Sequence, residues 1–188
     1  MSNSDTASIR PALPDDAPRL AELQAAYLLG DGGQGKADSP AGFLVSGYDA
    51  DSYRHFADVA DHFYVGEEDG RVIAFVLAMS SERIPEATPS HQVNHWLLEQ
   101  HPQPFTLISQ ICVAPEAASG GWGRELYNVV RQLAAGRPQF AAIVLDPPNG
   151  PSVRFHERVG FHKAFETVGH DGRPRGIWGR DLAGPPQS

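Results

Sequence analysis

Residues 119–124 read Ser-Gly-Gly-Trp-Gly-Arg and lie between an apolar run ending at Val113-Ala114-Pro115 and an amphipathic segment. A strand that leads into a glycine-rich turn at a helix N-terminus presents free backbone N–H groups to a ligand, and the helix dipole favours negative charge there. The pattern therefore predicts a phosphate-binding turn. A P-loop is excluded because no Gly-Lys-Ser/Thr follows. A dinucleotide-binding domain is disfavoured because the motif follows an antiparallel hairpin, and a purely structural glycine turn stays an alternative.

A second motif, residues 149–161, reads Asn-Gly-Pro-Ser-Val-Arg-Phe-His-Glu-Arg-Val-Gly-Phe. Together the two segments resemble the GNAT superfamily of N-acetyltransferases, whose members carry V-x-P, then R/Q-x-x-G-x-G/A, then N-x-x-(S/A)-x-x-F-Y-x-x-x-G-F. The resemblance is specific from Ile108 to Phe161. It looks closest to a bacterial subgroup whose Pro-Pro-Asn-x-x-Ser-x-x-Phe-His signature matches Pro147, Pro148, Asn149, Ser152, Phe155 and His156.

The resemblance implies that acetyl-CoA lies between the strand ending at Val113 and the strand ending at Asp146. The backbone of residues 111–113 would pair with the pantetheine arm and supply the oxyanion donor, and the amides of residues 119–124 would hold the pyrophosphate. An amine would then attack the thioester directly. The cofactor-binding residues implied in this way are Ile111, Cys112, Val113, Ser119, Gly120, Gly121, Trp122, Gly123, Arg124, Asn149, Ser152, Phe155 and Arg158.

Two residues depart from the family pattern. Ala118 stands where the phosphate motif carries Arg or Gln, so one long side chain toward the cofactor is missing. His156 stands where the family carries the tyrosine that protonates the departing thiolate. Imidazole titrates near neutrality, so we expect His156 to take over as catalytic acid. A packing and cofactor-contact role is the alternative.

The general base is less clear, because Ser109 and Gln110 stand in the region where many family members carry a strand glutamate. Glu82 is the nearest plausible carboxylate and is our candidate, with a solvated loop glutamate as the alternative. A nucleophilic role for Cys112 is disfavoured relative to a small buried core residue, because no convincing His-Asp pattern accompanies it.

The polar segment 80–104 contains residues that could contact an acceptor or a metal. We expect Asn94, His95 and Trp96 to line an acceptor pocket, with surface packing as the alternative. His91, His95 and His101 lack a His-Glu-x-x-His pattern, so no metal site is expected. Acceptor specificity is assigned to two long loops, 30–47 and 80–104.

The elements that must position these motifs follow from hydrophobic periodicity and turn residues. Asp69-Gly70 and Asp171-Gly172 predict two hairpins, and the strand–helix–strand order over 106–145 predicts one parallel pair. We therefore expect an α/β (α+β) fold, with a mixed, mostly antiparallel sheet of about six or seven strands flanked by about four helices. The resemblance implies that this is the GNAT fold. The whole chain, 1–188, is expected to form one domain with disordered tails at 1–6 and 184–188.

Composition narrows the function further. The formal net charge of −8 and pI of about 5.4 argue against a nucleic-acid partner, which needs a basic face. One cysteine and the lack of a long apolar run predict a reduced, cytoplasmic protein without a membrane partner. We expect acetyl-CoA as co-substrate, a small-molecule or peptide amine as acceptor, and a homodimer from the family resemblance. The competing hypothesis is a binding module that senses acetyl-CoA without turnover.

Overall fold

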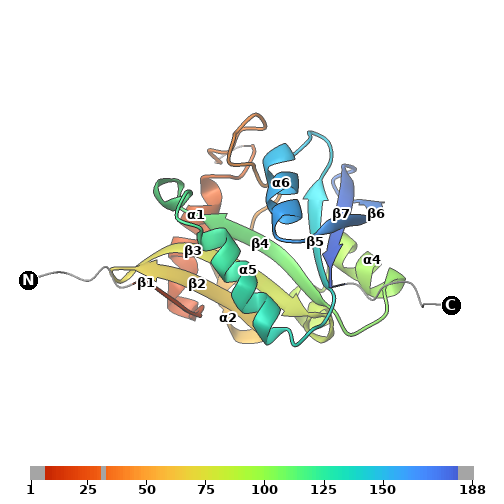
Figure 1. Cartoon of the computed structure of the whole chain (residues 1–188), viewed down its shortest axis with the longest axis horizontal. Helices are drawn as coiled ribbons and strands as arrows, with labels where there is room; N and C mark the ends of the chain where they lie inside the picture. Colours follow the sequence, from red (N-terminus) through yellow and green to blue (C-terminus); the bar gives the residue numbers. More distant parts are fainter. Residues whose placement is uncertain (1–6, 31–32, 182–188) are drawn as a thin grey trace, which may run out of the picture.

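A mixed seven-stranded sheet forms the centre of the computed structural model, which describes residues 7–30 and 33–181 (Figure 1). The tails expected at 1–6 and 184–188 lie outside these ranges. The strand order is β1-β2-β3-β4-β5-β7-β6, and only β4 and β5 run parallel. This confirms the predicted fold class. The strands are β1 (Ala7–Pro11), β2 (His62–Glu68), β3 (Arg71–Ser80), β4 (Thr106–Val113), β5 (Gln139–Val144), β6 (His162–Val168) and β7 (Pro174–Arg180).

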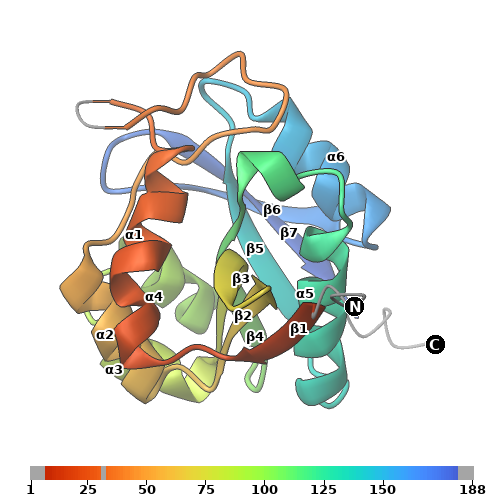
Figure 2. The same ribbon diagram turned by 90° about the vertical axis from the view of Figure 1, so that its left-hand side faces the viewer.

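Helices cover both faces of the sheet. Figure 2 shows α1 to α4 on one side and α5 and α6 on the other. Three 3₁₀ turns precede α1, α3 and α5, at Pro14–Asp16, Ser81–Arg83 and Pro115–Ala117. The α-helices are α1 (Ala17–Ala25), α2 (Ala50–Val59), α3 (Ile84–Ala87), α4 (Gln92–Gln100), α5 (Trp122–Leu133) and α6 (Gly150–Arg158).

The first predicted hairpin is confirmed in detail. Asp69 and Gly70 both adopt positive φ, 49° and 75°, which is the geometry a two-residue type I′ turn requires. Strand β3 is paired on both sides, which fixes its register. It is buried from Val72 to Ser80 and forms the middle of the core. The second hairpin also forms around Asp171-Gly172, but its strands begin at His162 and Pro174 rather than at Phe161 and Gly176.

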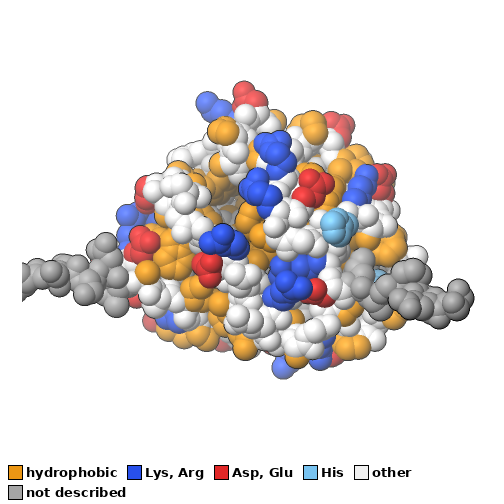
Figure 3. All heavy atoms as spheres, viewed as in Figure 1, with side chains coloured by type: hydrophobic (Ala, Val, Ile, Leu, Met, Phe, Trp, Pro, Cys, Tyr) orange, Lys and Arg blue, Asp and Glu red, His pale blue; other side chains and the backbone are white. Residues whose placement is uncertain are grey.

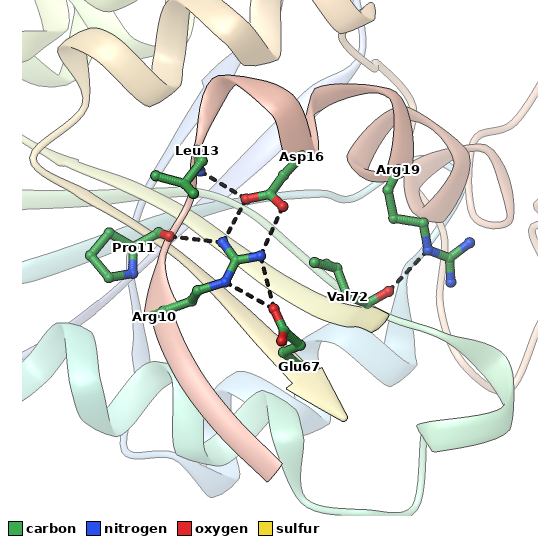
Figure 4. Close-up of polar contacts among 7 residues, drawn as sticks. All are labelled: Arg10, Pro11, Leu13, Asp16, Arg19, Glu67 and Val72. Atoms are coloured by element: carbon green, nitrogen blue, oxygen red, sulfur yellow. Dashed lines mark hydrogen bonds and ion pairs between the residues drawn. The ribbon is translucent and has the colours of Figure 1, made fainter. Parts of the chain in front are cut away.

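Salt bridges hold the N-terminal edge strand. The guanidinium of Arg10 donates to both carboxylate oxygens of Asp16, at 2.7 and 2.9 Å, and to Glu67 at 2.9 Å (Figure 4). Arg19 donates to the carbonyl of Val72 at 2.9 Å. These contacts tie β1 and the start of α1 to β2 and β3, so the edge of the sheet is held by side chains as well as by its ladder.

The parallel pair β4/β5 is short. Its partners are only Thr106–Ile108 with Gln139–Ala141, although both strands continue beyond these residues. A β-bulge at Ser109 accompanies the separation: Ile108 faces Ala78 and Gln110 faces Leu77, so Ser109 has no partner on β3. Bulges bend a strand and increase its twist. From Ser109 onward β4 therefore separates from β5 and leaves one edge open within the sheet.

Helix α5 packs through a row of residues four positions apart. Trp122, Leu126 and Val130 are buried, with Tyr127 beside them, whereas Leu133 is 54% exposed. The spacing of Leu126, Val129, Val130 and Leu133 predicts an apolar stripe, of which Leu126 and Val130 are buried, Val129 is partly buried and Leu133 is exposed. On a helix of 3.6 residues per turn, residues four positions apart are offset by a small angle at each step. The buried row therefore continues from Val130 to Ala134 rather than to Leu133.

Candidate functional site

A cleft of about 1020 Å³ opens where β4 and β5 separate. Its walls are the far half of β4, the N-terminal half of α5, one face of α6 along its whole length, and the loop at 40–44. Figure 3 shows Lys and Arg side chains around a hollow on the face that carries α5 and α6. All but one of the predicted cofactor residues line this cleft: Ile111, Cys112, Val113, Ser119, Gly120, Gly121, Gly123, Arg124, Asn149, Ser152, Phe155 and Arg158.

The open edge of β4 presents to the cleft backbone groups that no neighbouring strand pairs, although the Val113 carbonyl accepts from the Tyr27 hydroxyl. Ala114 N–H donates to the carbonyl of Ile73, so this antiparallel pair is a hydrogen-bonded one. Hydrogen-bonded pairs recur every second residue, which directs the backbone of Cys112 and Gln110 toward β3. The N–H and C=O groups of Ile111 and Val113 therefore point toward the gap, where an extended ligand could pair with them as a strand.

The glycine-rich turn begins α5 as an anion-binding terminus. Gly121 is the N-cap at φ +79°, a left-handed conformation that glycine adopts without strain. The first bond closing the helix runs from Glu125 N–H to the Gly121 carbonyl, so the amides of Trp122, Gly123 and Arg124 have no acceptor within the helix. Gly120 differs from the prediction, because its N–H already donates to the Ala117 carbonyl at 3.0 Å.

Two exposed arginines supply positive charge at this end of the cleft. Arg124 follows the turn and Arg158 lies at the end of α6, and both line the cleft. Ala118, which lacks the long side chain of the family pattern, also lines it. The lining therefore fits a ligand that carries phosphate, with Arg124 and Arg158 providing the cationic side chains and the turn providing amides.

Trp122 is the one predicted cofactor residue whose side chain lies elsewhere. Its ring packs beneath the turn against Gly66 of β2, where an added Cβ would come within 2.5 Å of the ring. Its Nε1–H donates to Glu68 at 3.0 Å. The indole thus anchors the start of α5 to the sheet, and only its backbone amide remains available to a ligand.

Asn149 has a double structural role. It is the N-cap of α6, where Oδ1 accepts from the Ser152 amide at 3.4 Å. Its Nδ2 donates to the carbonyl of Phe43 at 2.8 Å, which ties α6 to the loop that walls the cleft. The side chain is 5% exposed, so Asn149 positions the cleft wall even though it also faces the cavity.

His156 lines the cleft but does not have the protonation state expected of a catalytic acid. Its Nδ1 lies 2.8 Å from the carbonyl of Ser152, which can only accept, so the ring proton is on Nδ1. Nε2 then accepts from the Tyr127 hydroxyl at 2.8 Å. Burial lowers the pKa of His156 to about 4. An imidazolium near neutral pH, on which the predicted acid role depends, is therefore contradicted by this environment.

Glu82 does not lie in the site. It follows β3 at the closed end of the β4/β5 pair, where Ser80 faces Thr106, and it lines neither cavity at the separation. Its carboxylate accepts from Arg137 at 3.0 Å. Hydrogen bonds from its own backbone N–H, from Ser81 and from Arg137 lower the pKa of its carboxyl, which weakens it as a base. Glu82 therefore lies away from the position that a general base at the β4/β5 separation would occupy.

A second, smaller pocket of about 120 Å³ adjoins the cleft at Ser109 and Gln110. Of the three residues predicted to line an acceptor pocket, only Asn94 does so. His95 instead makes a hydrogen bond with the Thr88 carbonyl, and Trp96 packs against Phe165. The pocket wall also contains Tyr48, His91, His170 and Arg175, none of which the sequence motifs indicated.

Cys112 behaves as the predicted core residue. Its side chain is 3% exposed, and burial raises the pKa of the thiol far above its usual range. A nucleophilic cysteine needs a stabilised thiolate, and this environment disfavours one. Cys112 therefore contributes its place on β4 rather than reactive sulfur.

Two tyrosines in the cleft wall were not identified from the sequence. The hydroxyl of Tyr27 donates to the Val113 carbonyl on the open edge of β4, and Tyr127 faces His156 from α5. Tyr27 follows the end of α1 at helical spacing from Leu23, so its position in the chain gave only a packing signal. Nothing in the sequence pattern separated Tyr127 from the other buried residues of its helix.

Across residues 7–30 and 33–181, no cluster of three or more His, Cys, Asp or Glu side chains is placed to hold a metal ion. No helix in the same ranges is long and apolar enough to cross a bilayer.

Solved structures share this fold at low sequence identity. Naa20 from Chaetomium thermophilum, in complex with a bisubstrate analogue, superposes with a TM-score of 0.64 at 16% identity over 92% of this chain and 85% of that one. The ribosomal-protein-S18-alanine N-acetyltransferase from Escherichia coli gives 0.60 at 12% identity, over 97% and 99%. An N-acetyltransferase from Staphylococcus aureus Mu50 gives 0.61 at 14%, over 92% and 99%. These likenesses establish the fold alone.

The sequence itself supplies the family. A comparison with curated proteins finds no match. The family model described as "Acetyltransferase (GNAT) family" matches residues 35–161, a span that holds the open edge of β4, the turn before α5 and helix α6. The chain therefore belongs to the acetyltransferase (GNAT) family.

Proposed function

We propose that this protein transfers the acetyl group of acetyl-CoA to the amine of a small-molecule or peptide acceptor by direct attack on the thioester. The observation that supports this most directly is the meeting of two cavities at the separation of β4 and β5. The cleft with the anion-binding turn and the smaller pocket share Ser109 and Gln110 of β4 and Ala142 of β5. A nucleophile in the pocket and a thioester in the cleft would meet there.

The chain's own groups would do three things in this reaction. The free amides at the start of α5, with Arg124 and Arg158, would bind the phosphates. The backbone of Ile111 and Val113 would pair with the extended arm and supply an N–H donor to the thioester oxygen as it gains charge. Positioning of the two reactants is then a large part of the rate enhancement.

The side chains that line the two cavities determine which groups could take up or supply protons in the reaction. The amine must lose a proton as the C–N bond forms, and the thiolate gains one as the C–S bond breaks. Among the described residues, no carboxylate lines either cavity, and His156 is neutral and occupied at both ring nitrogens. We therefore assign the proton exchange to water at the mouth of the cleft, with the acceptor reacting as its free amine.

Thiol release tests the proposal. The protein is mixed with acetyl-CoA and a panel of amines and amino-terminal peptides, free coenzyme A thiol is measured, and acetylated products are confirmed by mass spectrometry. The proposal expects amine-dependent thiol release together with an acetylated amine. The competing sensor would bind acetyl-CoA, as measured by calorimetry, and release no thiol with any amine, which would overturn the proposal.

A further inference from the structure

The smaller pocket lies on the far side of the β4/β5 separation from the phosphate-binding turn. Its walls come from the end of β5, the loop at 43–46, the start of α4 and the turn between β6 and β7. These are the segments that a transferase needs to enclose its second substrate. At about 120 Å³ the pocket suits a small molecule or one residue better than an extended chain.

The ionisable side chains in its wall carry positive charge or donate hydrogen bonds. They are Tyr48, His91, His170 and Arg175, and no described residue of the wall is Asp or Glu. An enzyme that selects a purely cationic amine needs an anionic partner for the ammonium, because burying an unpaired charge is costly. The wall lacks one, so the acceptor's own charges must be balanced in another way.

Arg175 is the one permanent cation among the described residues of the wall, and it is 8% exposed. Two of its five N–H groups donate to protein acceptors, one to Asp171 at 2.8 Å and one to the Arg173 carbonyl at 3.0 Å. The carboxylate of Asp171 pairs with the guanidinium from outside the pocket wall. The remaining N–H groups, in the planar fork of the guanidinium, suit a second carboxylate.

His91 adds a donor at the same place. It is the N-cap of α4, where Nδ1 accepts from the Asn94 amide at 3.4 Å, so the neutral ring carries its proton on Nε2. Burial lowers the pKa of His91, and the charges of His170 and Arg175 lower it further. The guanidinium of Arg175 supplies positive charge to the same wall. The N-terminus of α4, whose Val93 also lines the pocket, has the same sign.

We propose that the acceptor is a small amine that carries its own carboxylate, as a free amino acid does, and that Arg175 and His91 bind this carboxylate. The inference rests on the proposed acetyl transfer and names its substrate class. A carboxylate on Arg175 would orient the molecule so that its amine reaches the junction at Ser109. Amines without a negative group, and the amino termini of peptides, would leave the remaining N–H groups of the Arg175 guanidinium without a carboxylate partner.

Matched acceptors test the proposal in the unmodified protein. Each set contains an amino acid, its amide, the corresponding amine without the carboxyl group, and a peptide beginning with the same residue. We expect kcat/KM for the amino acid of the best set to exceed that for its amide by at least about tenfold, the size of one charge-assisted hydrogen bond. A difference in amine basicity cannot cause this preference for the amino acid. The amine of the amide is less basic and more often unprotonated, so the amide would react faster if basicity decided the rate.

Variants then locate the carboxylate. Arg175→Gln should raise KM for the amino acid by at least about tenfold, remove the preference over the amide, and leave KM for acetyl-CoA unchanged. His91→Gln, at a half-buried position, should reduce the same preference if Arg175→Gln fails to fold. Arg173→Gln in the same turn is the matched control, because its exposed side chain does not line the pocket.

Two results would overturn the inference, and they are distinguishable. If amides, simple amines or peptides release thiol as fast as the matched amino acids, acetyl transfer stands and the carboxylate site is wrong. If acetyl-CoA binds but no acceptor of either kind releases thiol, the proposed function fails and the inference fails with it.

Discussion

The hydroxyl of Tyr127 on α5 lies 2.8 Å from Nε2 of His156 on α6. The histidine's other nitrogen donates to the Ser152 carbonyl one turn earlier in its own helix. Both side chains are buried, at 0% and 4% exposure, and the ring of Tyr127 also packs against Phe155. The pair therefore joins the two helices that carry the turn and the second motif, and it fixes His156 as a neutral residue.

This neutrality makes stability depend on pH. The folded pKa of His156 is about 4, below the value of 6.5 for an unperturbed histidine. Above pH 6.5 the ring is neutral in both states and contributes nothing to the pH dependence. As pH falls below 6.5 the unfolded chain binds the proton first, so stability decreases until about pH 4. Between pH 7 and pH 5 the loss from this residue should be about 2 kcal/mol.

Urea denaturation of the wild type and His156→Gln at pH 7 and pH 5 measures this loss. From pH 7 to pH 5 the free energy of unfolding should decrease less in the variant than in the wild type. The difference between the two decreases should be about 2 kcal/mol. His55→Gln is the matched control, because it makes the same substitution at an exposed histidine. Equal losses in wild type and His156→Gln would show that His156 is not buried as a neutral ring.

The same neutrality governs the pH dependence of turnover. With no carboxylate in the described walls of either cavity and no imidazolium at His156, kcat should rise with pH as the acceptor amine loses its proton. No decline should appear across the ordinary imidazole range. Steady-state rates from pH 6 to pH 9 with both substrates saturating measure this. A decline centred near pH 6.5 that disappears in His156→Gln would restore His156 as the catalytic acid.

Substitution of Gly121 tests the anion site at α5. Gly121→Asp places a negative charge beside the free amides, where the phosphates are proposed to bind, and the added Cβ would lie 3.7 Å from the Arg124 guanidinium. We expect coenzyme A affinity to fall by at least about tenfold in calorimetry. Gly121→Asn carries a similar backbone cost at φ +79° without the charge, and it should bind several times more tightly than the Asp variant. Equal affinity in the two variants would place the phosphates elsewhere.

Two substitutions of Asn149 distinguish its role as a helix cap from its role in forming the cleft wall. Asn149→Ala removes the cap and the donor to Phe43, and should cost about 1–2 kcal/mol of stability. Asn149→Asp retains a capping oxygen but loses that donor, so its helix should be less affected. Both should raise KM for acetyl-CoA about threefold to tenfold, because the loop at 40–44 forms the cleft wall. An unchanged KM in both variants would reduce Asn149 to a cap.

The sequence predicted those parts of the site that depend on backbone. The turn before α5, the start of α6 and the strand between them are defined by glycine, proline and apolar runs, whose local effects are strong. The hairpin at Asp69-Gly70 formed as predicted for the same reason. Trp122 shows the limit: its place in the turn was predicted, but the empty space above Gly66 that receives its ring depends on a strand far away in the chain.

Side-chain chemistry at the acceptor end was not predictable in this way. Arg175 and His170 come from the hairpin near the C-terminus, and His91 comes from the polar segment, so only the closed sheet brings them together. Glu82 illustrates the converse, because nearness in sequence did not bring it to the site. It follows β3 closely in sequence, but the strand runs toward the closed end of the β4/β5 pair and away from the separation. His156 was located correctly, whereas its protonation state depends on burial against Tyr127.

The short β4/β5 ladder has a consequence for how binding can be observed. Three residue pairs join β5, β7 and β6 to the rest of the sheet, and beyond them Ile111 and Val113 have no partner on β5. Amide hydrogen exchange is slow where the N–H group is held in a backbone hydrogen bond. A ligand chain that adds to this edge would slow exchange at alternate residues of β4 while leaving its neighbours on β3 unchanged. Occupancy of the cleft can thus be followed at single amides, without turnover and without knowledge of the acceptor.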